Sequence, residues 1–404
     1  MRYLFISTTF PDAANPARGT YNSALCRALA ERHEVRVISP RMFTEVLMWQ
    51  TSRTTPANIQ AAGIKAEYPT YWYTPKFWQE YYGDQMWWSV RRLVHRTLRE
   101  FQPDAVLSYF AHPDGQVGLQ AAQQMGIPSA VIVGGSDVLV LPNHPKRGQV
   151  VRRVLHETTR IITVSDGLRD KCIELGCAPA AVRTIYQGVE TDVFFQADKQ
   201  SARAERNIPQ DAEVLVWVGR MVSIKGLDLL IDAFQRVCTQ RPQARLYLLG
   251  DGPSRQEVEQ QAKRLGIADK VTCVGSVGHD QIADWYRAAD LCVLSSHSEG
   301  LPNVLRESLA CGTPFVSTDV GSIREIADER YSILVQERDP QEFADAILRG
   351  LQESYREAAA SFTPRTWHNC ADEVQEMFGE LFTQNQVTTQ AAPLRSREKV
   401  AAGK

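Results

Sequence analysis

The stretch from residue 291 to 318 constrains the fold of this chain most, because its pattern predicts a strand, a loop, a helix and a second strand in close succession. The run Leu291 to Leu294 is short and apolar, which is typical of a buried parallel strand. The pair Pro302-Asn303 suits the start of a helix, and Gly-Thr-Pro at 312–314 suits its end. Units of this kind build open α/β sheets, in which ligands lie outside the carboxyl ends of the strands.

This unit carries two carboxylates. Glu299 lies in the loop after the first strand, and Glu307 lies about one turn inside the helix. The amides of Gly300 and Leu301, with the helix N-terminus at Asn303, would offer donors and a positive dipole end to a phosphate. Acids beside an anion site make sense if they bind hydroxyl groups, as a sugar nucleotide would require. The alternative is that both are solvated surface acids, which is the usual state of an isolated Glu.

A second loop places two cations after a strand. A predicted strand from Glu213 to Val218 is followed by Gly219, Arg220 and then Lys225. Arginine offers a planar fork to phosphate oxygens, and lysine offers a mobile point charge. An isolated pair of this kind would more often be solvated, but together with the two acids it indicates a site for a diphosphate.

The segment from Ser298 to Glu307, followed by Ala-Cys-Gly-Thr-Pro at 310–314, resembles the Glu-x7-Glu signature of the family 4 retaining glycosyltransferases of GT-B fold. The resemblance covers most of the chain, and its type is that of exopolysaccharide and teichuronic acid biosynthesis. It implies an α/β protein with two doubly wound Rossmann-like domains facing each other across a cleft. The second domain would hold a nucleotide diphosphate sugar, and the first would hold the acceptor.

The resemblance also implies roles for single residues. Arg220, Lys225 and Glu299 would be catalytic, since the cations stabilise the departing diphosphate and the acid binds sugar hydroxyls. Glu307 would bind the ribose. The other donor-binding candidates are Gly19, Gly219, Gly275, Gly300, Leu301 and Asn303.

The first domain offers weaker candidates. Gly19 precedes a predicted helix and would let backbone approach a ligand, although a plain turn explains it equally well. His112 and Asp137 follow two predicted strands on the acceptor or sugar side. Similar enzymes have a histidine, in contact with the transferred sugar, where this chain has Gly134. His112 could take its place, or it could be a structural residue beside a proline.

We expect five segments along the chain. Residues 1–195 form the first domain, 196–211 a polar and irregular linker, and 212–362 the second domain. Residues 363–382 form a helix that returns to the first domain, and 383–404 form a polar, disordered tail.

The segment 68–101 is unusual, because a dense run of aromatic residues precedes a basic helix. This pattern fits contact with a membrane interface. The alternative is that the aromatic residues pack onto the first domain while the arginines form a solvated face.

The remaining features exclude several classes. A net charge of -2 argues against nucleic acid as a partner. The eight cysteines are scattered, which indicates small buried residues in a reducing cytoplasm rather than metal ligands. The N-terminus reads as a strand rather than a signal peptide, and there is no run of eighteen apolar residues to span a membrane.

We therefore predict a cytoplasmic enzyme of the hexosyltransferase type. If the aromatic segment contacts lipid, the enzyme is peripheral on the inner face of the plasma membrane. It would move a sugar from a nucleotide diphosphate to a glycan or lipid-linked acceptor in cell-surface polysaccharide synthesis. The sequence has no Asp-x-Asp motif, so we expect neither metal nor cofactor. Two alternatives remain: a non-catalytic sugar-nucleotide-binding partner of a polysaccharide-assembly complex, and a sugar-nucleotide epimerase on the same fold.

Overall fold

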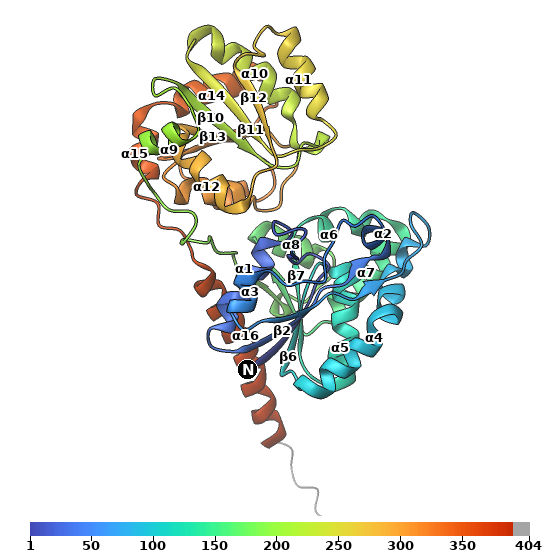
Figure 1. Ribbon diagram of the computed structural model, residues 1–404. Helices are drawn as coiled ribbons and strands as arrows, with labels where there is room; N and C mark the ends of the chain where they lie inside the picture. Colours follow the sequence, from blue (N-terminus) through green and yellow to red (C-terminus); the bar gives the residue numbers. More distant parts are fainter. Residues whose placement is uncertain (391–404) are drawn as a thin grey trace, which may run out of the picture.

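The computed structural model describes residues 1–390 and shows two α/β domains, one above the other in Figure 1. The first domain is built on a seven-stranded parallel sheet with the order β4-β2-β1-β6-β7-β8-β9. Its strands are β1 Arg2–Ile6, β2 Glu34–Ile38, β4 Lys65–Glu67, β6 Ala105–Tyr109, β7 Ser129–Val133, β8 Arg160–Thr163 and β9 Val182–Thr184. A small separate sheet pairs β3 Arg41–Met42 with β5 Thr70–Tyr71.

Helices cover both faces of the first sheet. Because successive strand residues point to opposite faces, Tyr3 and Phe5 of β1 pack in one core while Leu4 and Ile6 pack in another. The longer helices are α1 Thr20–Ala30, α4 Tyr82–Phe101, α5 Gln116–Met125, α7 Pro145–Glu157 and α8 Asp166–Glu174, and the short ones are α2 Phe43–Leu47, α3 Ala57–Ala61 and α6 Ser136–Leu139. The core on the Leu4 side is completed by α4 and α5.

The second domain has a six-stranded parallel sheet with the order β12-β11-β10-β13-β14-β15. Its strands are β10 Glu213–Val218, β11 Ala244–Leu249, β12 Val271–Gly275, β13 Leu291–Leu294, β14 Phe315–Thr318 and β15 Ser332–Val335. Its helices are α10 Leu227–Gln240, α11 Arg255–Arg264, α12 His279–Ala288, α13 Asn303–Ala310, α14 Pro340–Gly350 and α15 Glu353–Ala359. The strand and helix expected around residues 291 to 310 are therefore present as β13 and α13.

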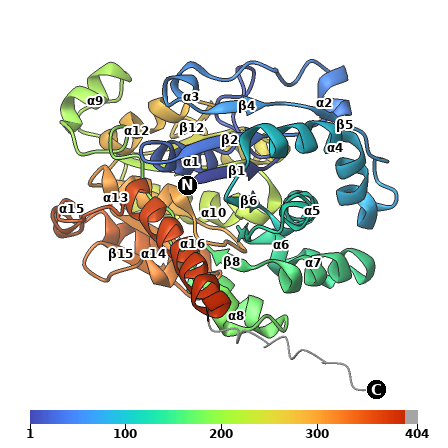
Figure 2. The same ribbon diagram turned by 90° about the horizontal axis from the view of Figure 1, so that it is seen from below.

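The last helix, α16 Trp367–Gln390, returns to the first domain, as Figure 1 shows in red. Val374 and Phe378 on this helix belong to the first-domain core, and the rings of Phe378 and Tyr3 are 5.8 Å apart. Seen from below in Figure 2, α16 runs toward α8, and Arg183 of β9 pairs with two of its glutamates. The prediction of disorder from residue 383 is wrong for residues 383–390, because these belong to α16. The rest of that predicted tail, 391–404, lies outside the described residues.

The predicted irregular linker at 196–211 is also wrong, because it contains the helix α9 Lys199–Glu205. The carboxylate of Asp198 caps this helix by accepting a hydrogen bond from the amide of Ser201, at 2.7 Å. Arg203 is buried and pairs with Asp290 of the second domain at 2.6 Å. Polar composition suggested a linker, but these polar residues fix the segment to the second domain.

The two domains also make direct contact through α8. The carboxylate of Glu325, in the second domain, accepts hydrogen bonds from the amides of Asp166 and Gly167 at 2.8 Å each. The hydroxyl of Tyr186 donates to the same carboxylate at 2.8 Å. An acid from one domain thus caps the helix N-terminus of the other, where the helix dipole favours negative charge.

Candidate functional site

Lys225 and Glu299 meet at the carboxyl edge of the second sheet. Lys225 ends the short turn after β10, and Glu299 lies in the loop between β13 and α13. The ammonium nitrogen of Lys225 lies 2.6 Å from Oε1 of Glu299, and the hydroxyl of Ser296 donates to the same oxygen at 2.6 Å. The structure thus brings together the loops after β10 and β13, which the sequence analysis identified separately.

Arg220 lies in the same loop as Lys225 but is exposed. Among the side chains that the structure describes, no acid forms an ion pair with it. Gly219 precedes it at the end of β10 and donates its amide to Leu249 at 3.0 Å. Gly275 ends β12, and its carbonyl oxygen accepts from the amide of Gly250 at 2.8 Å. These two glycines therefore lie along one edge of the sheet, with the cationic loop.

The turn before α13 fits closely between the two domains. The carbonyl oxygen of Gly300 accepts from the amide of Ser322 at 3.0 Å. Leu301 is buried and packs into the core of the first domain. Asn303 begins the helix, and the side chain of Pro302 before it has no polar group that could cap the first amides. The amide end of α13 therefore keeps donors that a bound anion could use.

Glu307 lies on α13, in a narrow space between the domains. It lines a cavity of about 10 Å³ together with Thr20 and Tyr21 of α1 and with His279 and Glu190. Space of this size holds about one water molecule, so a ribose would need the domains to separate here. Burial raises the pKa of Glu307, against the opposing effect of the nearby cations.

Sequence reasoning missed an ion-pair network beside Glu307. Glu190, on the first crossing between the domains, pairs with Arg27 of α1 and lies 2.9 Å from Nε2 of His279 on α12. Burial alone would lower the pKa of His279, but the hydrogen bond to Glu190 and the charge of Glu307 raise it. No short motif signals this network, because Arg27, Glu190 and His279 are far apart in the sequence.

Gly19 lies in the first domain, immediately before α1. Its φ is +62°, and a Cβ atom here would overlap the carbonyl oxygen of Thr9, so only glycine fits without strain. Thr20 and Tyr21, which follow it, line the cavity with Glu307. The structure therefore brings the start of α1, directly after Gly19, beside Glu307 of the second domain.

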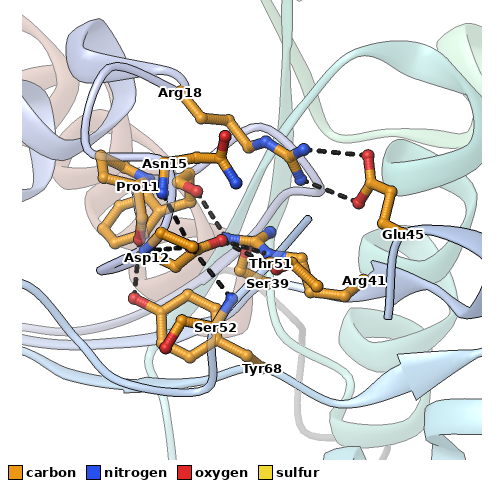
Figure 3. Close-up of polar contacts among 12 residues, drawn as sticks. Pro11, Asp12, Asn15, Arg18, Ser39, Arg41, Glu45, Thr51, Ser52 and Tyr68 are labelled. Atoms are coloured by element: carbon orange, nitrogen blue, oxygen red, sulfur yellow. Dashed lines mark hydrogen bonds and ion pairs between the residues drawn. The ribbon is translucent and has the colours of Figure 1, made fainter. Parts of the chain in front are cut away.

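The loop leading to Gly19 is held by a buried ion pair (Figure 3). The carboxylate of Asp12 lies 2.9 Å from Nε of Arg41, and both side chains are almost wholly buried. It also accepts hydrogen bonds from the hydroxyl of Thr51 at 2.9 Å and the amide of Ser52 at 3.1 Å. Burial alone would raise the pKa of Asp12, but these hydrogen bonds and the charge of Arg41 lower it. The network fixes residues 11–18 to the 41–52 segment.

The two sugar-side candidates of the first domain are both engaged internally. His112 is buried, its Nε2 lies 3.1 Å from the carbonyl oxygen of Gln79, and burial lowers its pKa to about 4. Asp137 is buried and accepts from the amides of Gly135 at 2.9 Å and Ala111 at 3.2 Å. Burial raises the pKa of Asp137 to about 6. In this conformation His112 is a neutral packed ring, and Asp137 organises two loops.

Within the described residues, no group of three or more His, Cys, Asp or Glu side chains is arranged to hold a metal ion. Over the same residues, none of the helices has the length and apolar character needed to span a membrane.

Comparison with known proteins identifies both halves of the chain. A family model described as Glycosyltransferase Family 4 matches residues 19–193, and one described as Glycosyl transferases group 1 matches residues 212–353. The D-inositol 3-phosphate glycosyltransferase of Streptosporangium roseum is 34% identical over 292 residues, which cover 66% of this chain and 67% of that protein. The putative teichuronic acid biosynthesis glycosyltransferase TuaC of Bacillus subtilis is 26% identical over 365 residues, covering 86% and 89%.

Solved structures agree on the fold. Sucrose-phosphate synthase from Thermosynechococcus elongatus superposes with a TM-score of 0.76 at 21% identity, over 95% of this chain and 99% of that one. Anabaena HepE in complex with UDP-glucose gives 0.69 at 19% identity, over 96% and 99%. With two parallel-sheet domains and matches along both, the chain belongs to the family 4 glycosyltransferases of GT-B fold.

Proposed function

We propose that this glycosyltransferase moves a hexosyl group from a nucleoside diphosphate sugar to a glycan or lipid-linked acceptor, with retention and without a metal. The single observation that carries the proposal is the Lys225–Glu299 pair at 2.6 Å beside the uncapped amide end of α13. A cation, helix amides and a carboxylate fit the diphosphate and the hydroxyl groups of one donor. HepE, which has this fold, is described with UDP and with UDP-glucose, so uridine is the first base to test.

The chemistry follows from charge. When the bond between sugar and phosphate breaks, the leaving diphosphate gains negative charge, which Arg220 and Lys225 stabilise where they stand. One preorganised hydrogen-bonding group of this kind lowers the activation free energy by about 3 kcal/mol, or roughly two orders of magnitude in rate. Retention follows if the acceptor attacks on the face from which the diphosphate leaves and the leaving phosphate takes the acceptor's proton. Glu299 then holds sugar hydroxyls, and Glu307 holds the ribose.

The decisive experiment combines donor binding with product analysis. Uridine, guanosine, adenosine and thymidine diphosphates and their glucose derivatives are screened by thermal shift on wild type and Arg220→Ala, since binding stabilises the folded state. We expect nucleotides of one base to raise the melting temperature of wild type and to leave that of Arg220→Ala unchanged. Sugar transfer to an added acceptor then supports the proposal. A changed donor sugar with no acceptor present would indicate an epimerase, and binding without turnover on any acceptor would indicate a non-catalytic partner.

We also propose that the protein works at the inner face of the plasma membrane, through the 68–101 segment. This segment divides in two: Tyr68 and Tyr71 are buried in the first domain, while Trp72, Phe77 and Trp88 are exposed. The exposed large apolar residues of this segment are Trp72, Phe77, Trp78, Tyr81 and Trp88, and the earlier stretch 47–49 adds Leu47, Met48 and Trp49. Aromatic residues beside cations suit the interface of an anionic membrane.

Vesicle sedimentation tests this surface. We expect wild type to bind vesicles of anionic phospholipid more than neutral ones, and Trp78→Ser to bind less. The control is Tyr355→Ser, a partly buried aromatic residue of the second domain. Equal sedimentation of wild type and Trp78→Ser would contradict the membrane assignment and leave the proposed transfer reaction untouched.

A further inference from the structure

Gly134 leaves a space that another residue fills. It follows β7, next to the end of β6, and the two strands are paired. A Cβ atom on Gly134 would overlap the hydroxyl oxygen of Tyr109 and would lie 2.8 Å from its Cζ atom. Tyr109 is the last residue of β6, so its phenol occupies the position that a side chain at 134 would take.

This position faces the candidate site across the domain boundary. A Cβ atom on Gly300 would lie 3.0 Å from the carbonyl oxygen of Gly134, so the two loops are in contact. Gly300 directly follows Glu299, whose carboxylate holds Lys225 at 2.6 Å. The end of Tyr109 is therefore on the first-domain side of the loop that carries the Lys225–Glu299 pair.

A second tyrosine links Tyr109 to Glu307. The rings of Tyr21 and Tyr109 lie 4.9 Å apart. Tyr21 lines the small cavity together with Glu307. Burial raises the pKa of Tyr109 well above its usual value and that of Tyr21 to about 12, so both phenols stay neutral and can donate and accept hydrogen bonds.

We propose that the hydroxyl of Tyr109 is the group with which the first domain contacts the sugar of the bound donor, and that it helps to set sugar specificity. This inference rests on the proposed function. Arg220 and Lys225 already supply positive charge for the diphosphate, whereas a neutral hydroxyl matches sugar hydroxyl groups, which also donate and accept. The carboxylate of Glu299, in the facing loop of the second domain, can only accept hydrogen bonds, so a hydroxyl that can also donate complements it.

The test compares Tyr109→Phe with wild type by calorimetric titration of a nucleoside diphosphate and its glucose derivative, using the base that stabilises wild type most. We expect the affinity for the diphosphate to stay the same and the affinity for the sugar form to fall about fivefold, which corresponds to one neutral hydrogen bond. The control is Tyr3→Phe, which removes a buried hydroxyl that contacts Met1, at the opposite end of the sheet. An unchanged affinity ratio in Tyr109→Phe would overturn the inference while leaving the donor site standing.

A second measurement tests the placement of Tyr109 itself. Introduced into the wild-type sequence, Gly134→Ala should lower the unfolding midpoint temperature, because the new methyl group overlaps the phenol of Tyr109. Introduced into Tyr109→Ala, the same substitution should lower it less. Equal losses in both backgrounds would overturn the placement. If none of the nucleotides or their sugars binds wild type, the proposed function fails, and this inference fails with it.

Discussion

Nζ of Lys225 and Oε1 of Glu299 are 2.6 Å apart, and their side chains are only 23% and 10% exposed. The cation that should bind the donor diphosphate is thus already engaged by the acid that should bind the donor sugar. A bound donor has to compete for the ammonium group. As the diphosphate leaves and its negative charge grows, Lys225 is attracted to it more strongly, which favours the transition state over the bound substrate.

We predict that Lys225→Ala lowers turnover about a hundredfold and changes the Michaelis constant little, since the charge it stabilises develops only as the bond breaks. Steady-state kinetics with the donor found by the thermal-shift screen measures both constants. Lys263→Ala, an exposed lysine of α11, is the matched control. A rise in the Michaelis constant with unchanged turnover would place Lys225 in substrate binding alone.

We predict that Glu307→Ala weakens donor binding roughly ten- to a hundredfold, the usual effect of losing hydrogen bonds to a charged group. Direct titration with the nucleoside diphosphate measures it, because this ligand includes the ribose and lacks the sugar. Glu342→Ala, at an exposed acid of α14, should bind as wild type does. Equal affinity in wild type and Glu307→Ala would refute the ribose role.

The sequence predicted those features that depend on short segments. The apolar run at 291–294 and the Pro302-Asn303 pair located β13 and the first residue of α13, because burial and helix initiation depend on neighbouring residues. The sequence also grouped Lys225 and Glu299 in one site, but their ion pair depends on the sheet order, in which β10 and β13 are adjacent.

The remainder depends on residues distant in the chain. Nothing local to Gly134 shows that Tyr109 fills its side-chain space, and nothing near Asp12 shows that Arg41 neutralises it. The linker was misjudged for a related reason: its polar residues looked solvated, whereas Arg203 is buried against Asp290. Composition cannot separate a solvated charge from one that is paired across the fold.

We predict a pH-dependent contribution of His279 to stability. The pKa of His279 is raised in the folded protein, so protonation of its ring stabilises the fold. This stabilisation is fully present below the pKa of the unfolded state, about 6.5, and is lost as the pH rises through the pKa of the folded state. The groups facing it are Glu190, Glu307 and Asp280, with Arg27 on the far side of Glu190.

Denaturant unfolding of wild type and His279→Gln at a series of pH values measures this effect. The difference in free energy of unfolding should be largest at pH 6 and below and should shrink toward pH 9. His156→Gln, at an exposed histidine of α7, should show no such trend. A difference that is constant with pH would mean that His279 acts only through packing.

We predict that Arg41→Met destabilises the protein by about 3–5 kcal/mol, because it leaves the buried carboxylate of Asp12 without its cation. Denaturant unfolding, followed by fluorescence and circular dichroism together, measures the loss. Arg18→Met is the matched control, since Arg18 pairs with Glu45 through the same loop but its side chain is 24% exposed, and its removal should cost at most about 1 kcal/mol. The double variant Arg41→Met/Asp12→Leu should recover part of the loss, because it removes the stranded charge as well. If it is no more stable than Arg41→Met, the lost hydrogen bonds of both side chains, to Thr8 and Phe10 from the arginine and from Thr51 and Ser52 to the carboxylate, outweigh the effect of the stranded charge.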